Sequence, residues 1–427
     1  MNRKQRRSGG RFGPAPAGGP PASATAAHLF AAAAGQHQAG AYAEAERRYR
    51  YILSLFPDHA DSLNNLGLLM LHGGNPSSAA ELIGKAIKLD DRVAQYHYNI
   101  SLAWRALDRM DQVAAHLERA AELRPDQGLT FLNLGNVRRQ QGRLADAMSC
   151  YERAQSLLSN SAVAGVSLAD VLSELGRWDD ASAAYRRALA AEPNNAETHH
   201  RFGRALLAQG KGREAVAQFK DAVALGPNVS AVYEGLGTAL LSVGEIDSAI
   251  DAVVRGLELG ETQHGQALFA HCVKSVRFTA KNDRLCRLVF RALTEGWSRP
   301  RDLDNVCISI VKLNPVVRDC IARAVAARPI RLDAAELFGD GGLAALAADE
   351  LLAALLRCDP IPDTSLECLL ANVRAVMLEE ATGRGEAIAD RDLSFYAAVA
   401  RQCFINEYIY ALGDGEDERV RNLQARL

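Results

Sequence analysis

The sequence repeats itself every 34 residues, and this period constrains the fold more than any other feature of the chain. Six blocks begin at residues 60, 94, 128, 162, 196 and 230 without insertion or deletion, and a weaker seventh block begins at 26. The eighth position of every block is Ala, Gly or Ser, and Ala predominates at the twentieth and twenty-seventh positions. Small residues at these places would let two helices approach closely. A period of this length predicts stacked helical units over residues 26–263.

Glycine and proline mark the expected ends of the helices in each block. Four blocks close on proline, which would break the second helix, at Pro57, Pro125, Pro193 and Pro227. The fifteenth position is glycine in six blocks, where it would end the first helix in a left-handed conformation: Gly40, Gly74, Gly142, Gly176, Gly210 and Gly244. Each block is therefore predicted to form two antiparallel helices.

These features together resemble the tetratricopeptide repeat. The resemblance implies an all-α fold, a right-handed α-solenoid of about seven helix pairs over residues 26–263. It also implies that the first helix of each pair lines a concave groove. Bulky residues at the seventh and twenty-fourth positions are expected in the core.

The composition limits the possible partners and compartment. The chain has 49 basic and 51 acidic residues, a balance that disfavours a general nucleic-acid or membrane-surface binder. Its eight cysteines form no metal-ligand pattern, and a disulfide scaffold is not expected at this length, so we expect a cytoplasmic protein. Residues 1–25 form a basic leader rich in Pro and Gly, which is expected to be disordered.

Polar residues recur on the expected groove face of the first helices. Asparagine occupies the sixth position of three consecutive blocks, at Asn65, Asn99 and Asn133, with Asn64 and Asn136 beside them. An amide both donates and accepts hydrogen bonds, so a ladder of amides could hold an extended peptide backbone. The strings around Asn65 and Asn133 resemble the asparagine-lined groove of the O-linked N-acetylglucosamine transferase repeats. Alternatively, asparagine is only a common residue of the repeat, solvated in the groove.

Four arginines are expected on the same face, where they would select acidic or polar side chains of a bound peptide: Arg105, Arg139, Arg201 and Arg204. The neighbouring Asp170, Glu174 and His200 give the face a mixed charge, which favours a peptide over a uniform polyanion.

The 34-residue period is no longer clear after residue 263. Residues 264–297 predict a helix pair that caps the stack, and residues 298–427 predict a C-terminal helical domain. Its helices are expected at 303–312, 316–327, 343–357, 365–379 and 391–412, and Asp363 with Glu367 suggests a capped start for one of them.

The C-terminal segment RQCFINEYIY, residues 401–410, combines a thiol, an amide and a carboxylate. It lies in a run that is apolar nearly all round, which is typical of a buried helix. Cys403 is then a small core residue, because the chain has no histidine after His271 to activate it. Asn406 and Glu407 would join a hydrogen-bond network; a docking surface and in-chain catalysis are the alternatives.

Residues 298–427 also resemble the helical segment that precedes the catalytic domain in bacterial S-adenosylmethionine-dependent methyltransferases with tetratricopeptide repeats. The glycine-rich strand–loop–helix that would bind the methyl donor is missing from this sequence, so methyltransferase activity is not expected of this chain alone. The residues offer no other catalytic, cofactor or metal motif, and we assign none. Two functions follow: a scaffold that binds extended peptide segments of other proteins, or the substrate-recruiting or regulatory part of a split or truncated methyltransferase.

Overall fold

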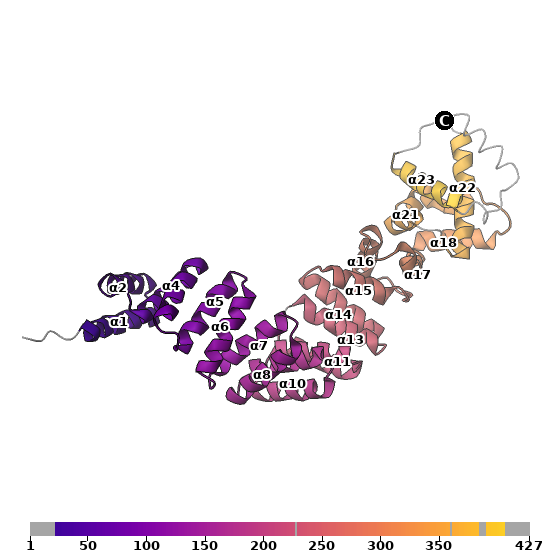
Figure 1. Ribbon diagram of the computed structural model, residues 1–427. Helices are drawn as coiled ribbons and strands as arrows, with labels where there is room; N and C mark the ends of the chain where they lie inside the picture. The colour runs from indigo at the N-terminus through magenta and orange to yellow at the C-terminus, as the bar shows by residue number, and fades with distance from the viewer. Residues whose placement is uncertain (1–21, 227–228, 359–360, 384–389, 406–427) are drawn as a thin grey trace, which may run out of the picture. The chain divides into compact units, whose positions relative to one another are not determined.

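The structure is a computed structural model that describes residues 22–226, 229–358, 361–383 and 390–405. Every regular element among these residues is helical, which confirms the predicted all-α class (Figure 1). The chain divides into two compact units, Met1–Asn194 and Asn195–Leu427. Among the described residues, no helix combines the length and the hydropathy of a membrane span.

The first unit is a row of helix pairs. Its helices are α1 (Ala22–Gln38), α2 (Tyr42–Leu55), α3 (Ala60–His72), α4 (Pro76–Leu89), α5 (Ala94–Ala106), α6 (Met110–Leu123), α7 (Gly128–Gln140), α8 (Leu144–Leu157), α9 (Ala162–Glu174) and α10 (Trp178–Ala191). From α3 on, each first helix begins at the first residue of a sequence block and each second helix at the seventeenth. The predicted 34-residue period is therefore confirmed.

The turns inside the pairs have the predicted left-handed backbone. The fifteenth-position glycines of the first unit have φ values between +73° and +79°. The block that begins at residue 94 carries Asp108 at the fifteenth position instead, with φ +56°. Its turn still closes with the hydrogen bond of its neighbours, from the Arg109 amide to the Trp104 carbonyl at 2.9 Å.

The core lies where the two helices of a pair cross. Tyr49, Tyr151 and Tyr185, all at the twenty-fourth position, are buried. A Cβ atom on Gly135 would lie 2.6 Å from the ring of Tyr151, so this small position is needed for the close approach of α7 and α8. First helices of successive pairs also touch directly, α3 with α5 and α7 with α9. They form the surface that we call the first-helix face.

The second unit begins with two further pairs. Its helices are α11 (Ala196–Ala208), α12 (Gly212–Ala224), α13 (Ser230–Ser242), α14 (Ile246–Leu259), α15 (Gln263–Val273), α16 (Asp283–Thr294), α17 (Pro300–Val311), α18 (Pro315–Ala326), α19 (Ala334–Phe338), η1 (Gly339–Gly341), α20 (Gly342–Ala347), α21 (Glu350–Leu356), α22 (Thr364–Gly383) and α23 (Asp390–Ile405). α15 packs against α13 and α14, whereas α16 packs mainly against α17 and α21.

The C-terminal helices lie close to their predicted ranges, with two differences. The single helix expected at 343–357 is divided into α20 and α21, because the Asp349 carboxylate accepts the Leu352 amide at 2.8 Å and starts a new helix. The short helices α19 and η1 were not expected. The capped start predicted at Asp363 is present, since its Oδ1 accepts the Leu366 amide at 3.0 Å.

Candidate functional site

The sixth-position asparagines link consecutive first helices. Asn99 Nδ2 on α5 donates to Asn64 Oδ1 on α3 at 2.9 Å. Asn133 Nδ2 on α7 donates to the Tyr98 hydroxyl on α5 at 2.9 Å. In both pairs, the sixth position of one block reaches the fifth position of the block before it, 35 residues away. These amides therefore hold the stack together.

The hydrogen bonds continue across three helices. Gln95 Nε2 donates to Asn99 Oδ1 at 2.8 Å, and Asn64 Nδ2 donates to Asn65 Oδ1 at 2.9 Å. Asn65 Nδ2 then donates to the buried Tyr49 hydroxyl at 3.2 Å. Asn64 and Asn99 are only 4% and 3% exposed, and buried amides require such partners. These two amides are used inside the protein, where a bound peptide would not reach them.

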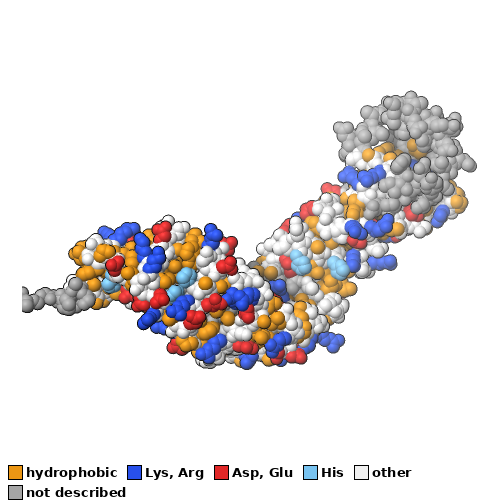
Figure 2. Space-filling model, viewed as in Figure 1, with side chains coloured by type: hydrophobic (Ala, Val, Ile, Leu, Met, Phe, Trp, Pro, Cys, Tyr) orange, Lys and Arg blue, Asp and Glu red, His pale blue; other side chains and the backbone are white. Residues whose placement is uncertain are grey.

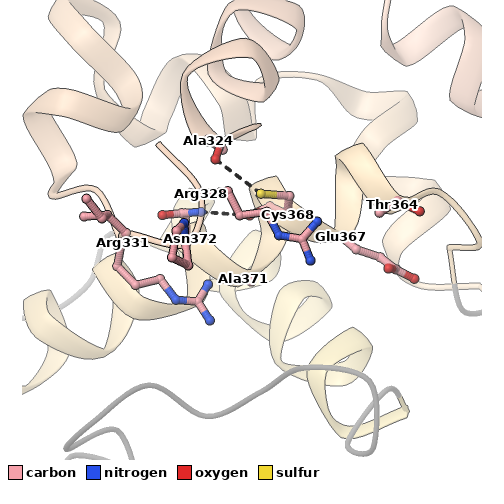
Figure 3. A pocket seen from close by; sticks show the side chains of 10 residues that line it. Ala324, Arg328, Arg331, Thr364, Glu367, Cys368, Ala371 and Asn372 are labelled. Atoms are coloured by element: carbon pink, nitrogen blue, oxygen red, sulfur yellow. Dashed lines mark hydrogen bonds between the residues drawn. The ribbon is translucent and has the colours of Figure 1, made fainter. Parts of the chain in front are cut away.

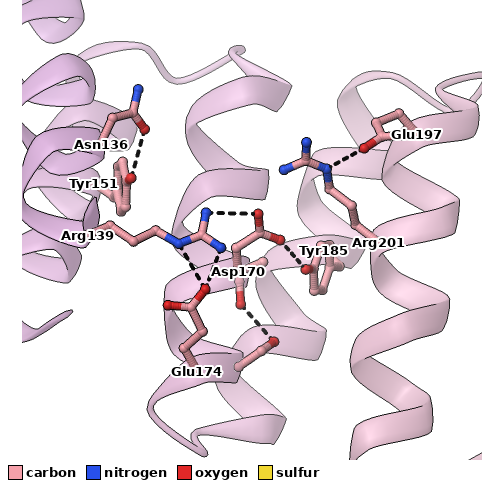
Figure 4. A network of polar contacts seen from close by, with 10 residues as sticks. Asn136, Arg139, Tyr151, Asp170, Glu174, Tyr185, Glu197 and Arg201 are labelled. Atoms are coloured by element: carbon pink, nitrogen blue, oxygen red, sulfur yellow. Dashed lines mark hydrogen bonds and ion pairs between the residues drawn. The ribbon is translucent and has the colours of Figure 1, made fainter. Parts of the chain in front are cut away.

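Asn133 and Asn136 keep an unused polar atom. Among the described residues, Asn133 Oδ1 has no hydrogen-bond partner, and the half-buried Asn133 uses only its Nδ2. Asn136 is an exposed residue, and its Oδ1 accepts the Tyr151 hydroxyl at 2.8 Å (Figure 4). Burial raises the pKa of Tyr151 to about 12, so this hydroxyl remains a neutral donor. The site therefore offers one acceptor and one donor on α7.

Arg139 is neutralised by two carboxylates of the next first helix. Its Nε donates to Glu174 Oε1 at 2.9 Å and its terminal nitrogens contact Asp170 and Glu174 (Figure 4). Asp170 also accepts the Tyr185 hydroxyl at 2.5 Å. The hydrogen bond to Glu174 raises the pKa of Arg139 above its ordinary value. An acidic ligand would have to displace these partners.

The other three predicted arginines differ from Arg139. Arg201 Nε donates to Glu197 Oε1 at 2.7 Å, one turn away on α11. Arg204 and Arg105 are exposed, and neither forms an ion pair within the part of the chain that the structure describes. Basic, acidic and apolar side chains are interspersed over the repeats on the face drawn in Figure 2, as the balanced charge predicts.

The C-terminal motif is described only in part. Gln402 on α23 is buried, and its Nε2 donates to the Leu356 carbonyl at 2.9 Å, which agrees with the predicted buried helix. Asn406 and Glu407, the two residues predicted to join a network, lie outside the described residues.

A pocket of about 280 Å³ lies between α18 and α22 and was not predicted from the sequence (Figure 3). Its walls are tied by their own polar groups: Cys368 Sγ donates to the Ala324 carbonyl at 3.3 Å, and Asn372 Oδ1 accepts the Leu332 amide at 3.0 Å. The pocket depends on how two helices distant in sequence pack, so no local motif could have predicted it.

Within the described residues, no three His, Cys, Asp or Glu side chains form a metal-binding group.

Comparison with known sequences supports the repeats. The sequence model of the tetratricopeptide repeat matches residues 36–99, 138–201 and 172–233. The human protein O-mannosyl-transferase TMTC3 is 29% identical over 102 residues, which are 24% of this chain and 11% of that protein. The chain thus spans a small part of this relative's length.

Three solved structures are similar to part of this chain. MamA is 25% identical, with a TM-score of 0.36 over 39% of this chain and 96% of its own. PilF of Pseudomonas aeruginosa is 22% identical, with a TM-score of 0.44 over 50% and 97%. YrrB, a tetratricopeptide repeat protein with an unusual peptide-binding site, is 20% identical, with a TM-score of 0.38 over 44% and 96%. The residues matched by the sequence model and the observed helix pairs together show that this chain carries tetratricopeptide repeats.

Proposed function

We propose that the first-helix face of the first unit binds an extended segment of another protein. Stacked helical repeats present long surfaces of this kind for partner chains. The observation that carries the proposal is the exposure of two aliphatic side chains, Leu129 on α7 at 51% and Val163 on α9 at 60%. Both occupy the second position of their blocks, on first helices that touch each other.

The polar groups beside these side chains suit a peptide main chain. Asn133 Oδ1 can accept a peptide N–H, and Asn136 Nδ2 can donate to a peptide carbonyl. Main-chain hydrogen bonds give affinity for any extended segment, and the apolar contacts select its side chains. The proposed ligand is therefore an extended peptide with aliphatic residues.

A peptide array probed with the full chain tests this proposal. Replacing Leu129 and Val163 together by Ser should weaken binding by about tenfold, because two apolar contacts are lost. The matched control is the double replacement of Leu55 and Leu89 by Ser, since these residues are 49% and 45% exposed on the second helices α2 and α4. Equal effects of the two double variants would exclude the first-helix face.

Substrate recruitment for a separate methyltransferase remains a second prediction. It rests on the resemblance of residues 298–427 alone, and no described contact favours it. Calorimetry of this chain with S-adenosylmethionine, alone and with a candidate partner enzyme, would test it.

A further inference from the structure

We propose that Arg105, Asn136 and Gln140 form a subsite for an acidic side chain of the bound peptide. The subsite lies between α5 and α7 on the first-helix face, and it rests on the proposed peptide-binding function. Its ligand is an aspartate or glutamate carboxylate within an extended segment.

Arg105 and Arg139 occupy the same position in consecutive blocks, so their surroundings can be compared. Arg139, at the twelfth position of its block, binds Asp170 and Glu174, which lie 31 and 35 residues later. Arg105 holds the twelfth position of the block before, and the residues 31 and 35 later are Asn136 and Gln140. Where one pair of blocks has two carboxylates at these spacings from its arginine, the preceding pair therefore has two amides.

The ninth position is held by the same kind of hydrogen bond in both blocks. The Tyr151 hydroxyl donates to Asn136 at 2.8 Å, as the Tyr185 hydroxyl donates to Asp170 at 2.5 Å. The ninth position of each block therefore has the same location relative to its own second helix. We infer that the side chain of Arg105 is directed toward Asn136 and Gln140, as that of Arg139 is directed toward Asp170 and Glu174.

The balance of charge is what differs. Arg105, Asn136 and Gln140 are exposed, and among the described residues Arg105 has no acidic partner. Asn136 Oδ1 accepts the Tyr151 hydroxyl, and its NH₂ group has no acceptor among the residues that the structure describes. A guanidinium beside amide donors attracts a carboxylate, because charge-assisted hydrogen bonds are stronger than neutral ones. A partner's acid would take the place that Asp170 and Glu174 fill in the next block.

The same helix sets the spacing of the ligand's side chains. Leu129 and Asn136 are seven residues apart on α7, two turns along one face. That separation is about 10 Å, which an extended peptide spans in about three residues. The preferred segment therefore has its acid about three residues from an aliphatic side chain.

Selection from a randomised library of peptides of about 12 residues tests the subsite on the full chain. An extended peptide of this length spans about 40 Å, which is enough to cross three adjacent helices. The informative variant is Asn136→Asp with Gln140→Glu, which copies the acids of the next block and neutralises Arg105 internally. Arg105→Gln removes the cation. Lys85→Gln, an exposed basic residue on α4, is the control.

The parent chain and Lys85→Gln should select peptides enriched in Asp and Glu about three residues from an aliphatic residue. The other two variants should lose this enrichment. Replacing the acid of a selected peptide by its amide should weaken binding to the parent by about tenfold and leave binding to Arg105→Gln unchanged.

Two failures can be told apart. If peptides bind but show no enrichment in acids, or if Arg105→Gln selects the same peptides as the parent, the subsite is wrong and the proposed function stands. If no peptide binds the parent or any variant, the proposed function itself is wrong, and the subsite with it. Thermal unfolding of each variant checks that its fold is retained.

Discussion

At the scale of single residues, the buried amides contribute to stability. Asn99→Ala removes the donor to Asn64 and the acceptor of Gln95. Because Asn64 is buried and loses a partner, we expect the free energy of unfolding to fall by about 1–3 kcal/mol. Asn133→Ala, at a half-buried position, should cost about 0.5–1.5 kcal/mol. Urea denaturation measures both, and no loss for Asn99→Ala would contradict the structural role.

The role of these asparagines could be predicted only in part. Their recurrence at the sixth position placed them correctly on the first helices. Their partners were missed, because the period fixes each residue within its own block and not the offset between neighbouring helices. The missed signal is a second spacing of 35 residues, which joins Asn64 to Asn99 and Tyr98 to Asn133.

We expect a histidine pair to make the block that begins at residue 94 sensitive to acid. The Nδ1 atoms of His97 and His116 lie 3.1 Å apart, and His97 Nε2 lies 3.1 Å from the Asp91 carbonyl. The carbonyl can only accept, so His97 Nε2 carries a proton and its Nδ1 accepts from His116. Burial lowers the pKa of both imidazoles; for His97, the Asp91 hydrogen bond opposes this shift and Arg119 adds to it.

The pH dependence of stability follows from the sign of these shifts. The folded pKa values lie below the ordinary value of 6.5, so the unfolded chain binds protons first as the pH falls. The contribution of the neutral histidine pair to the free energy of unfolding should be complete above pH 6.5 and should decrease as the pH falls below it. The block that begins at residue 196 has His199 and Gln218 at the same two positions. His199 Nδ1 and Gln218 Oε1 lie 2.9 Å apart.

His116→Gln copies that pair and should flatten the loss of stability between about pH 6.5 and 5, because a protonated His97 could still donate to the glutamine oxygen. Chemical denaturation of the parent and the variant at a series of pH values measures the slope. Identical slopes would show that this histidine pair does not cause the acid sensitivity.

At the scale of elements, the turns depend on a left-handed residue. Asp108 adopts φ +56° where the other blocks use glycine. Asp108→Gly should raise the free energy of unfolding by about 0.5 kcal/mol, since glycine adopts this conformation without steric cost. Gly142→Ala should lower it by about 1 kcal/mol. A Cβ on Gly142 would meet no atom within 4 Å, so this loss comes from the backbone alone. Denaturant midpoints should move in opposite directions, and a stabilising Gly142→Ala would refute the argument.

The helices of the repeats were predictable because every block repeats the same signals. Helix starts at Ala60, Ala94 and Ala162 coincide with the starts of sequence blocks. The C-terminal region has no period to average over, so a single cap decides each boundary. Asp349 divides a run that looks continuous by its apolar spacing alone.

At the scale of the whole molecule, the chain combines repeats with a C-terminal set of helices. In the first unit, the first-helix face carries the exposed Leu129 and Val163. Within the described part of the chain, it also carries amide atoms on α7 without a hydrogen-bond partner and an arginine on α5 without an acidic partner. Asn64, Asn99 and Arg139 instead bond to neighbouring helices of the stack. This division of roles is what makes a narrow path across α5, α7 and α9 the proposed binding site.

Photo-crosslinking of a bound peptide locates the binding site on the protein. A peptide selected by the full chain, with a photoreactive group beside its aliphatic residue, is irradiated on the protein and the attachment sites are read by mass spectrometry. Our account predicts attachment to α7 and α9 near Leu129 and Val163, and competition by the unlabelled peptide. Attachment mainly to the second helices, or to helices α15–α23, would contradict it.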